Sequence, residues 1–192
     1  MIRAIVFDCF GVLAEDGWSP FKRQYISHDP ELVKQVAALG KEVDEGRWSF
    51  DDMISETAQL VGVSEETVRS AVEHKVPNEA LFQYIGEVLK PVYKIGMLSN
   101  ASYNVLDLLF APEQAALLDA SALSYEVGLT KPDKAMFEVI AQRLGVGLHE
   151  ILMIDDQPRH CEGAVATGMQ ALRYRDMEQL KRELPEVLEV NA

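Results

Sequence analysis

Residues 2–13, IRAIVFDCFGVL, join a short apolar run to an acid and a glycine. The run at 2–7 is rich in apolar and β-branched side chains and ends at Asp8, and Gly11 follows as a turn signal. This pattern predicts a buried β-strand with Asp8 at its carboxyl end. A carboxylate there can act as a nucleophile or as a metal ligand, although an Asp that only begins a turn fits the fragment equally well.

Similar apolar runs recur along the chain, and segments with helical spacing of apolar residues separate them. The further runs lie at 93–98, 121–125, 151–154 and 169–174. Apolar side chains fall on one helical face over 81–89 and again over 136–144. This alternation predicts an α/β fold with a parallel sheet covered by helices on both faces, which binds ligands beyond the carboxyl ends of its strands.

Residues 15–77 have a different character, because no convincing strand pattern is present and the apolar residues have helical spacing. Glycines at 40, 46 and 62 separate the helical pieces, and Ser64 followed by two acids predicts a helix start. We therefore expect a small helical insert between the two parts of an α/β core, 1–14 and 78–192.

The composition limits the class of protein and its partners. The chain has 192 residues, 48% hydrophobic and 26% charged, which is typical of one globular domain with a small insert. Its 18 basic and 31 acidic side chains give a net charge of −13, which repels a nucleic-acid backbone, so we expect no nucleic-acid partner. The chain has no apolar run of bilayer length and no signal-peptide cleavage site, so we expect no membrane partner and a cytoplasmic location. The composition leaves the oligomeric state open.

Two further polar clusters follow apolar runs. GMLSN ends with Ser99 and Asn100, which can donate hydrogen bonds to an oxyanion or cap the helix that follows. In GLTKPD, Lys131 precedes Pro132. We expect this proline at the first position of a helix, which would direct the lysine toward the strand ends.

The last cluster, MIDDQP, places Asp155 and Asp156 directly after a buried run. Two adjacent like charges at a buried strand end are unfavourable unless a cation compensates them. Mg²⁺ prefers one or two carboxylates together with waters and phosphate oxygens, a preference that suits Asp8 together with Asp156. His160, in the first turn of the helix expected next, is interpreted as a solvated residue.

Taken in order, Asp8, Ser99, Lys131 and the pair Asp155 and Asp156 resemble the four motifs of the haloacid dehalogenase-like (HAD) hydrolase superfamily. The resemblance extends over roughly residues 2 to 175. It implies a Rossmann-like α/β core, the HAD fold, with a helical cap inserted between the first and second motifs. The predicted insert has the position, length and helical character of such a cap.

The resemblance also implies a mechanism and a role for each motif. Asp8 would attack phosphorus to form an aspartyl phosphate that water hydrolyses, while Ser99 would bind the phosphoryl group and Lys131 would neutralise charge. The implied Mg²⁺ ligands are Asp8, Asp156, the backbone carbonyl of Phe10 and, in a supporting role, Asp155. The expected function is that of a Mg²⁺-dependent phosphatase acting on a small phosphorylated metabolite such as a sugar phosphate.

One position departs from the pattern of these phosphatases. They usually carry a second Asp two residues after the nucleophile as general acid and base, and this chain has Phe10 there. General acid–base catalysis is typically worth ~10² to 10⁴ in rate, so either the leaving group is good or another acid serves. Candidate substitutes are Glu15, Asp16, Asp44 and Glu45.

The first motif, with the aromatic Phe10, also resembles that of the 2-haloacid dehalogenases. Those enzymes need no metal. Their fourth motif typically has Ser and Asn where this chain has Asp155 and Asp156, so the acids favour Mg²⁺ and phosphate. A third alternative is a HAD-like protein that binds a phosphorylated ligand without turnover.

The candidate substrate contacts are Ser99 and Asn100 in the core and, in addition, Arg47 and Trp48 in the insert. Arg47 could hold an anionic substrate. Trp48 could contact the substrate or pack in the core of the insert.

Overall fold

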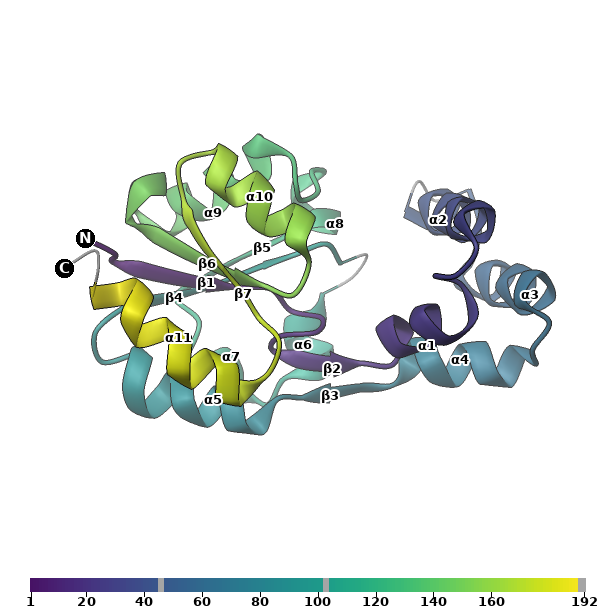
Figure 1. Cartoon of the computed structure of the whole chain (residues 1–192), viewed down its shortest axis with the longest axis horizontal. Helices are drawn as coiled ribbons and strands as arrows, with labels where there is room; N and C mark the ends of the chain where they lie inside the picture. The colour runs from purple at the N-terminus through teal and green to yellow at the C-terminus, as the bar shows by residue number, and fades with distance from the viewer. Residues whose placement is uncertain (45–46, 102–103, 190–192) are drawn as a thin grey trace. The chain divides into compact units, whose positions relative to one another are not determined.

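The computed structural model describes residues 1–44, 47–101 and 104–189, and the chain divides into two compact units (Figure 1). The core unit comprises Met1–Ala14 with Pro77–Ala192, and the insert unit comprises Glu15–Val76. These bounds differ by one residue from the division expected from the sequence.

The core unit is built on a five-stranded parallel sheet with the strand order β5-β4-β1-β6-β7. Its strands are β1 (Ala4–Phe7), β4 (Lys94–Ser99), β5 (Ala120–Leu123), β6 (Ile151–Asp155) and β7 (Gln170–Arg173). In the central strand, Phe7 pairs with Met97 of β4 and Ile154 of β6. The chain therefore leaves all three strands at one edge of the sheet. The α/β fold predicted from the sequence is confirmed.

Helices cover both faces of this sheet (Figure 1). The main ones are α5 (Glu79–Tyr84) and α11 (Met177–Glu189) on one face, and α9 (Lys134–Leu144) and α10 (Pro158–Ala166) on the other. Side chains of β1 alternate between the faces, since Ile5 and Phe7 pack in the first apolar cluster and Ala4 and Val6 in the second. Among the described residues, no helix has the length and apolarity needed to cross a bilayer.

Two of the predicted helix starts are wrong. The helix after β4, α6 (Val105–Leu109), is capped by the side chain of Asn104 rather than by Ser99 or Asn100. Helix α9 begins at Lys134 with Asp133 as its cap, so Pro132 precedes the helix. The remaining elements of the core unit are η1 (Ile85–Leu89), α7 (Pro112–Ala115), α8 (Ser124–Val127) and η2 (Leu148–Glu150).

The insert unit consists of helices around a small apolar core of its own. The helices are α1 (Trp18–Tyr25), α2 (Pro30–Asp44), α3 (Phe50–Val61) and α4 (Glu65–Glu73). The hydroxyl of Ser64 accepts a hydrogen bond from the Thr67 amide, so the predicted start of α4 is confirmed. Two paired strands, β2 (Ala14–Asp16) and β3 (Lys75–Pro77), lie at the ends of the insert. These strands are not predicted from the sequence, because three residues are too few to produce a readable alternation.

Candidate active site

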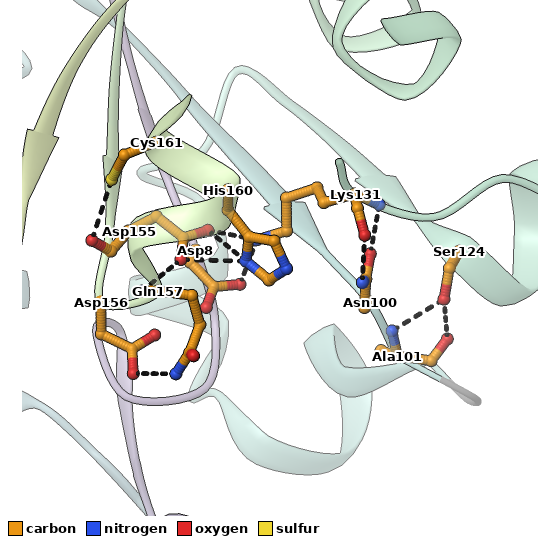
Figure 2. Close-up of polar contacts among 10 residues, drawn as sticks. All are labelled: Asp8, Asn100, Ala101, Ser124, Lys131, Asp155, Asp156, Gln157, His160 and Cys161. Atoms are coloured by element: carbon orange, nitrogen blue, oxygen red, sulfur yellow. Dashed lines mark hydrogen bonds and ion pairs between the residues drawn. The ribbon is translucent and has the colours of Figure 1, made fainter. Parts of the chain in front are cut away.

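Three carboxylates and one ammonium group meet at the carboxyl edge of the sheet (Figure 2). Asp8 follows β1, Asp155 ends β6, and Asp156 comes next in the chain. Lys131 reaches them from the loop between α8 and α9, with its Nζ 2.7 Å from Asp8 Oδ1 and 2.6 Å from Asp155 Oδ2. The parallel register of β1 and β6 brings these distant segments together.

The charges of this cluster do not balance. Lys131 and Asp155 have side chains 1% and 0% exposed, and Asp8 is also buried. Three carboxylates and one ammonium leave a formal charge of −3 + 1 = −2 when all are ionised. Uncompensated charges inside a protein are strongly unfavourable, so the site favours a further cation.

The carboxylates are close enough to share a metal ion. One oxygen from each of Asp8, Asp155 and Asp156 lies within 4.8 Å of the others. Oδ1 of Asp156 is buried and has no hydrogen-bond partner among the residues that the structure describes. A buried carboxylate oxygen without a donor is a suitable ligand for a hard cation, so the site could hold a divalent metal.

Asp155 differs from its neighbour because protein donors already occupy both of its oxygens. Oδ2 accepts from Lys131, and Oδ1 accepts from the backbone amide of Gln157 at 2.9 Å. Nδ1 of His160 lies 3.0 and 3.1 Å from the two oxygens. Burial alone would raise the pKa of Asp155, but the hydrogen bonds from His160 and Lys131 lower it. Asp155 is therefore suited to organise the cluster, and Asp156 to bind a metal directly.

The nucleophile candidate has the opposite electrostatic character. Burial raises the pKa of Asp8 to about 6, against the opposing charge of Lys131 and with further raising by Asp155. Burial and the neighbouring Asp155 also raise the pKa of Asp156. Burial alone would lower the pKa of Lys131, but the charges of Asp8 and Asp155 raise it, so the lysine stays protonated. A cation placed on these carboxylates favours the ionised form of Asp8, the form that can attack phosphorus.

The loop after Asp8 packs directly against Asp156. Gly11 has a φ of +89°, and a Cβ there would lie 3.0 Å from Cγ of Asp156, so both the backbone conformation and the space require glycine. In the same loop, the Phe10 side chain packs against the apolar cluster of the core. Phe10 therefore contributes an apolar ring at the position where the family resemblance implies an acid.

Ser99 and Asn100 lie at the end of β4 and differ in their bonding. Ser99 is fully buried, and within the described residues its Oγ has no hydrogen-bond partner, so the hydroxyl remains available to a ligand oxygen. The side-chain amide of Asn100 instead forms two hydrogen bonds with the backbone of Lys131. Its Oδ1 accepts from the Lys131 N–H at 2.7 Å, and its Nδ2 donates to the Lys131 carbonyl at 3.0 Å. Asn100 thus positions the Lys131 loop, and its contact with a substrate stays a prediction.

His160 was interpreted from the sequence as a solvated residue, and this is wrong. It is 5% exposed, and its ring points to Asp155 from the first turn of α10 (Figure 2). The error arose because exposure was inferred from the position in the helix alone. A helix that begins three residues after a buried acid, as α10 does after Asp155, can turn a first-turn side chain back onto that acid, which is the available sequence signal.

Arg47 and Trp48 lie in the insert unit, described here by itself. The Arg47 guanidinium pairs with Glu42, and its Nη2 lies 2.7 Å from Glu42 Oε1. Both residues line a pocket of about 360 Å³ whose other walls are Asp52, Ser55 and Glu56.

The four candidate replacements for an acid at Phe10 have different surroundings. Asp16 is engaged at the start of α1, where its oxygens accept from the Trp18 amide at 2.7 Å and from the Ser19 hydroxyl at 2.6 Å. Glu15 is exposed in β2. The side chain of Asp44 and the whole of Glu45 lie outside the described residues.

Comparison with known proteins gives the site a context. A family model described as haloacid dehalogenase-like hydrolase matches residues 2–168. The chain is 28% identical to phosphatase MT3486 of Mycobacterium tuberculosis, over 88% of this chain and 86% of the relative. It is 25% identical to D-ribitol-5-phosphate phosphatase of Bacteroides thetaiotaomicron, over 98% and 99% of the two chains. The fold resembles a HAD family enzyme of the same organism, solved with magnesium and inorganic phosphate, with a TM-score of 0.62, 21% identity and coverage of 94% and 99%.

Proposed function

We infer that this chain, which belongs to the haloacid dehalogenase-like hydrolase family, is a Mg²⁺-dependent phosphatase acting on a small phosphorylated metabolite. The observation that carries the proposal is the buried group of Asp8, Lys131 and Asp155, beside an Asp156 oxygen that no described donor satisfies. The phosphatases among the relatives and the magnesium and phosphate bound to the related enzyme support the same chemistry.

The residues suited to hold Mg²⁺ are Asp8, Asp156 and, as the family resemblance implies, the backbone carbonyl of Phe10. When bound there, the ion supplies positive charge to the carboxylates and to the phosphoryl oxygens. A carboxylate oxygen of Asp8 attacks phosphorus, the bond to the leaving oxygen breaks, and that oxygen departs with the electron pair. Lys131 holds Asp8 in place and carries positive charge next to the transferring group, while the Ser99 hydroxyl donates to a phosphoryl oxygen.

Water completes the reaction by attacking phosphorus of the aspartyl phosphate. The bond between phosphorus and the Asp8 oxygen breaks, the electron pair returns to the carboxylate, and the proton of the water passes to the phosphate product. The protein's contribution is positioning and charge stabilisation, which are the main requirements of phosphoryl transfer.

The metabolite class remains a proposal, and a sugar or polyol phosphate is its most specific form. The D-ribitol-5-phosphate phosphatase among the relatives supports it. An alkyl phosphate of this kind has a poor leaving group, and the Phe10 side chain cannot protonate it, so the leaving oxygen takes its proton from another acid or from water. We propose Arg47 and Trp48 of the insert unit as further substrate contacts, as predicted from the sequence. The cytoplasmic location, and the exclusion of nucleic acid and membranes as partners, stay predictions from the sequence.

The first experiment measures hydrolysis of p-nitrophenyl phosphate with Mg²⁺ and with EDTA, because the acidic leaving group of this substrate needs little protonation. We expect turnover only with Mg²⁺ and its abolition in Asp8→Asn. The control is Asp107→Asn, an exposed acid of α6 that should retain wild-type activity.

Two further measurements, of halide release and of phosphate binding, discriminate the other two functions. Halide release from a 2-haloacid in EDTA would indicate a dehalogenase. Phosphate binding without either reaction would indicate a binding protein. Residual p-nitrophenyl phosphate turnover in Asp8→Asn would overturn the assignment of the nucleophile.

A further inference from the structure

His160 is a buried polar residue whose ring, among the residues that the structure describes, makes hydrogen bonds to Asp155 alone. Its Nδ1 lies 3.0 Å from Oδ1 and 3.1 Å from Oδ2 of Asp155, and the residue is 5% exposed. Both oxygens of Asp155 already accept hydrogen bonds, Oδ2 from the Lys131 ammonium and Oδ1 from the Gln157 amide, so the carboxylate is the acceptor in this contact as well. The proton of this contact therefore lies on Nδ1 of His160.

The Asp155 carboxylate is fixed by three donors from two separate parts of the core unit, the Lys131 loop and the start of α10. Lys131 approaches from the loop before α9, the Gln157 amide from the start of α10, and His160 from the first helical turn (Figure 2). Nζ of Lys131 also donates to Oδ1 of Asp8 at 2.7 Å. A rotation of the Asp155 carboxylate would therefore displace the ammonium group that lies against the nucleophile.

The second ring nitrogen of His160 shows that packing alone does not explain this residue. Nε2 is buried and has no hydrogen-bond partner within the described part of the chain. An unpartnered buried nitrogen is unfavourable, and an apolar side chain of similar size would avoid it. An imidazole at this position is therefore explained by the bond that Nδ1 makes.

We propose that His160 is a positioning residue for phosphoryl transfer, which orients Asp155 and through it holds Lys131 against Asp8. The inference rests on the proposed phosphatase function. It assigns to the Nδ1–H group of His160 a role in the rate of turnover, separate from metal binding by Asp156.

Three substitutions of His160 separate the donor from the bulk of the ring. In asparagine, Nδ2 is attached to Cγ as Nδ1 is in histidine, so His160→Asn retains a donor at the same distance from the backbone. His160→Leu retains the branching at Cγ and removes the donor. His160→Gln moves the donor one carbon outward. The matched control is His28→Leu, at an exposed histidine of the insert unit.

Turnover of p-nitrophenyl phosphate with saturating Mg²⁺ is the first measurement. Partners that orient the groups of a metal site typically affect activity by 10- to 100-fold. We expect kcat to fall by about that factor in His160→Leu and His160→Gln, with KM within about threefold of the wild type. His160→Asn should stay within about threefold of the wild-type kcat, and His28→Leu should match the wild type.

Two further measurements distinguish positioning from packing. Isothermal titration of Mg²⁺ should give affinities within about threefold for all variants, because Asp156 and Asp8 remain. Thermal unfolding should rank His160→Leu at least as stable as His160→Asn, since leucine fills the buried space better. A packing role predicts that activity follows the same rank, with leucine the more active, whereas positioning predicts the reverse.

The possible results separate this inference from the proposed function. A wild-type protein without turnover would remove both. A wild-type protein that turns over, together with a fully active His160→Leu, would overturn only the role of His160. An asparagine variant as slow as the leucine variant would also overturn it, because the donor would then not be the group that matters.

Discussion

The core and insert units each place one cation between two carboxylates, and the surroundings differ. Lys131 lies between Asp8 and Asp155 with its side chain 1% exposed. Arg69 lies 2.6 Å from Asp51 and 3.4 Å from Glu73, and these three side chains are 35%, 76% and 59% exposed. Water screens the second group, whereas the first group has only protein around it.

The comparison indicates why the group around Lys131, rather than the group around Arg69, is the candidate for catalysis. Exposed ion pairs contribute little because water solvates the separate charges equally well. Buried charges depend on each other, and the pKa of Asp8 rises to about 6 because burial and neighbouring carboxylates oppose its ionisation. A buried group of this kind responds strongly to an added cation or to a phosphoryl group, and an exposed one does not.

The largest expected effect is the loss of stability on removing the central cation of the core group, and removal of its counterpart in the insert is the comparison. Lys131→Met leaves two buried carboxylates without their ammonium, and breaking a buried pair typically costs about 3–5 kcal/mol. Arg69→Met should cost far less, because the charges of Asp51 and Glu73 remain hydrated. Urea denaturation at pH 8 without added metal measures both free energies of unfolding. Equal losses in the two variants would contradict the comparison.

The next effect concerns the pH dependence of stability. The pKa of Asp8 is raised from 3.8 to about 6 in the folded protein, so between these values the folded state binds more protons than the unfolded state. Stability from this group is therefore fully present below pH 3.8 and is lost as pH rises to about 6. Asp8→Asn removes this ionisation. Without metal, the free energy of unfolding of the variant should therefore exceed that of the wild type by up to about 3 kcal/mol at pH 8 and match it near pH 4.

For an exposed acid of the insert, the pH dependence of stability has the opposite sign. Hydrogen bonds from the side chain and backbone of Ser49 lower the pKa of Asp52, so its ionised form stabilises the fold above the unfolded pKa. Asp52→Asn should therefore lose a little stability at pH 8. Unfolding curves from pH 4 to pH 8 test both variants, and a pH-independent difference for Asp8→Asn would disprove the raised pKa.

The smallest effect is expected at the pocket of the insert unit. Trp48→Ala should raise KM for D-ribitol 5-phosphate about tenfold, or about 1.4 kcal/mol, and change KM for p-nitrophenyl phosphate much less. The control is Trp18→Ala, because Trp18 stacks on Phe21 at 5.2 Å within the insert and should affect stability rather than KM. Equal KM changes for both substrates in Trp48→Ala would remove the pocket from substrate selection.

The sequence alone determined the parallel α/β core and the set of residues at its carboxyl edge. Each motif consists of a buried run followed at once by reactive side chains, as at Asp8, Ser99 and Asp155, and this order is visible along the chain. Parallel strands that alternate with helices end at one edge of the sheet, so the segments had to meet.

Only the tertiary structure decided what each of these side chains does next to its neighbours. In the structure, both Asp155 oxygens accept hydrogen bonds, whereas Oδ1 of Asp156 has no partner among the described residues. The Asn100 side chain bonds to the Lys131 backbone. The fold also buries His160 against Asp155. Periodicity along the chain encodes which residues face the interior, but contacts between side chains of separate segments depend on strand register, loop path and rotamer. These three are set by packing of the whole core unit, and no local stretch of sequence contains them.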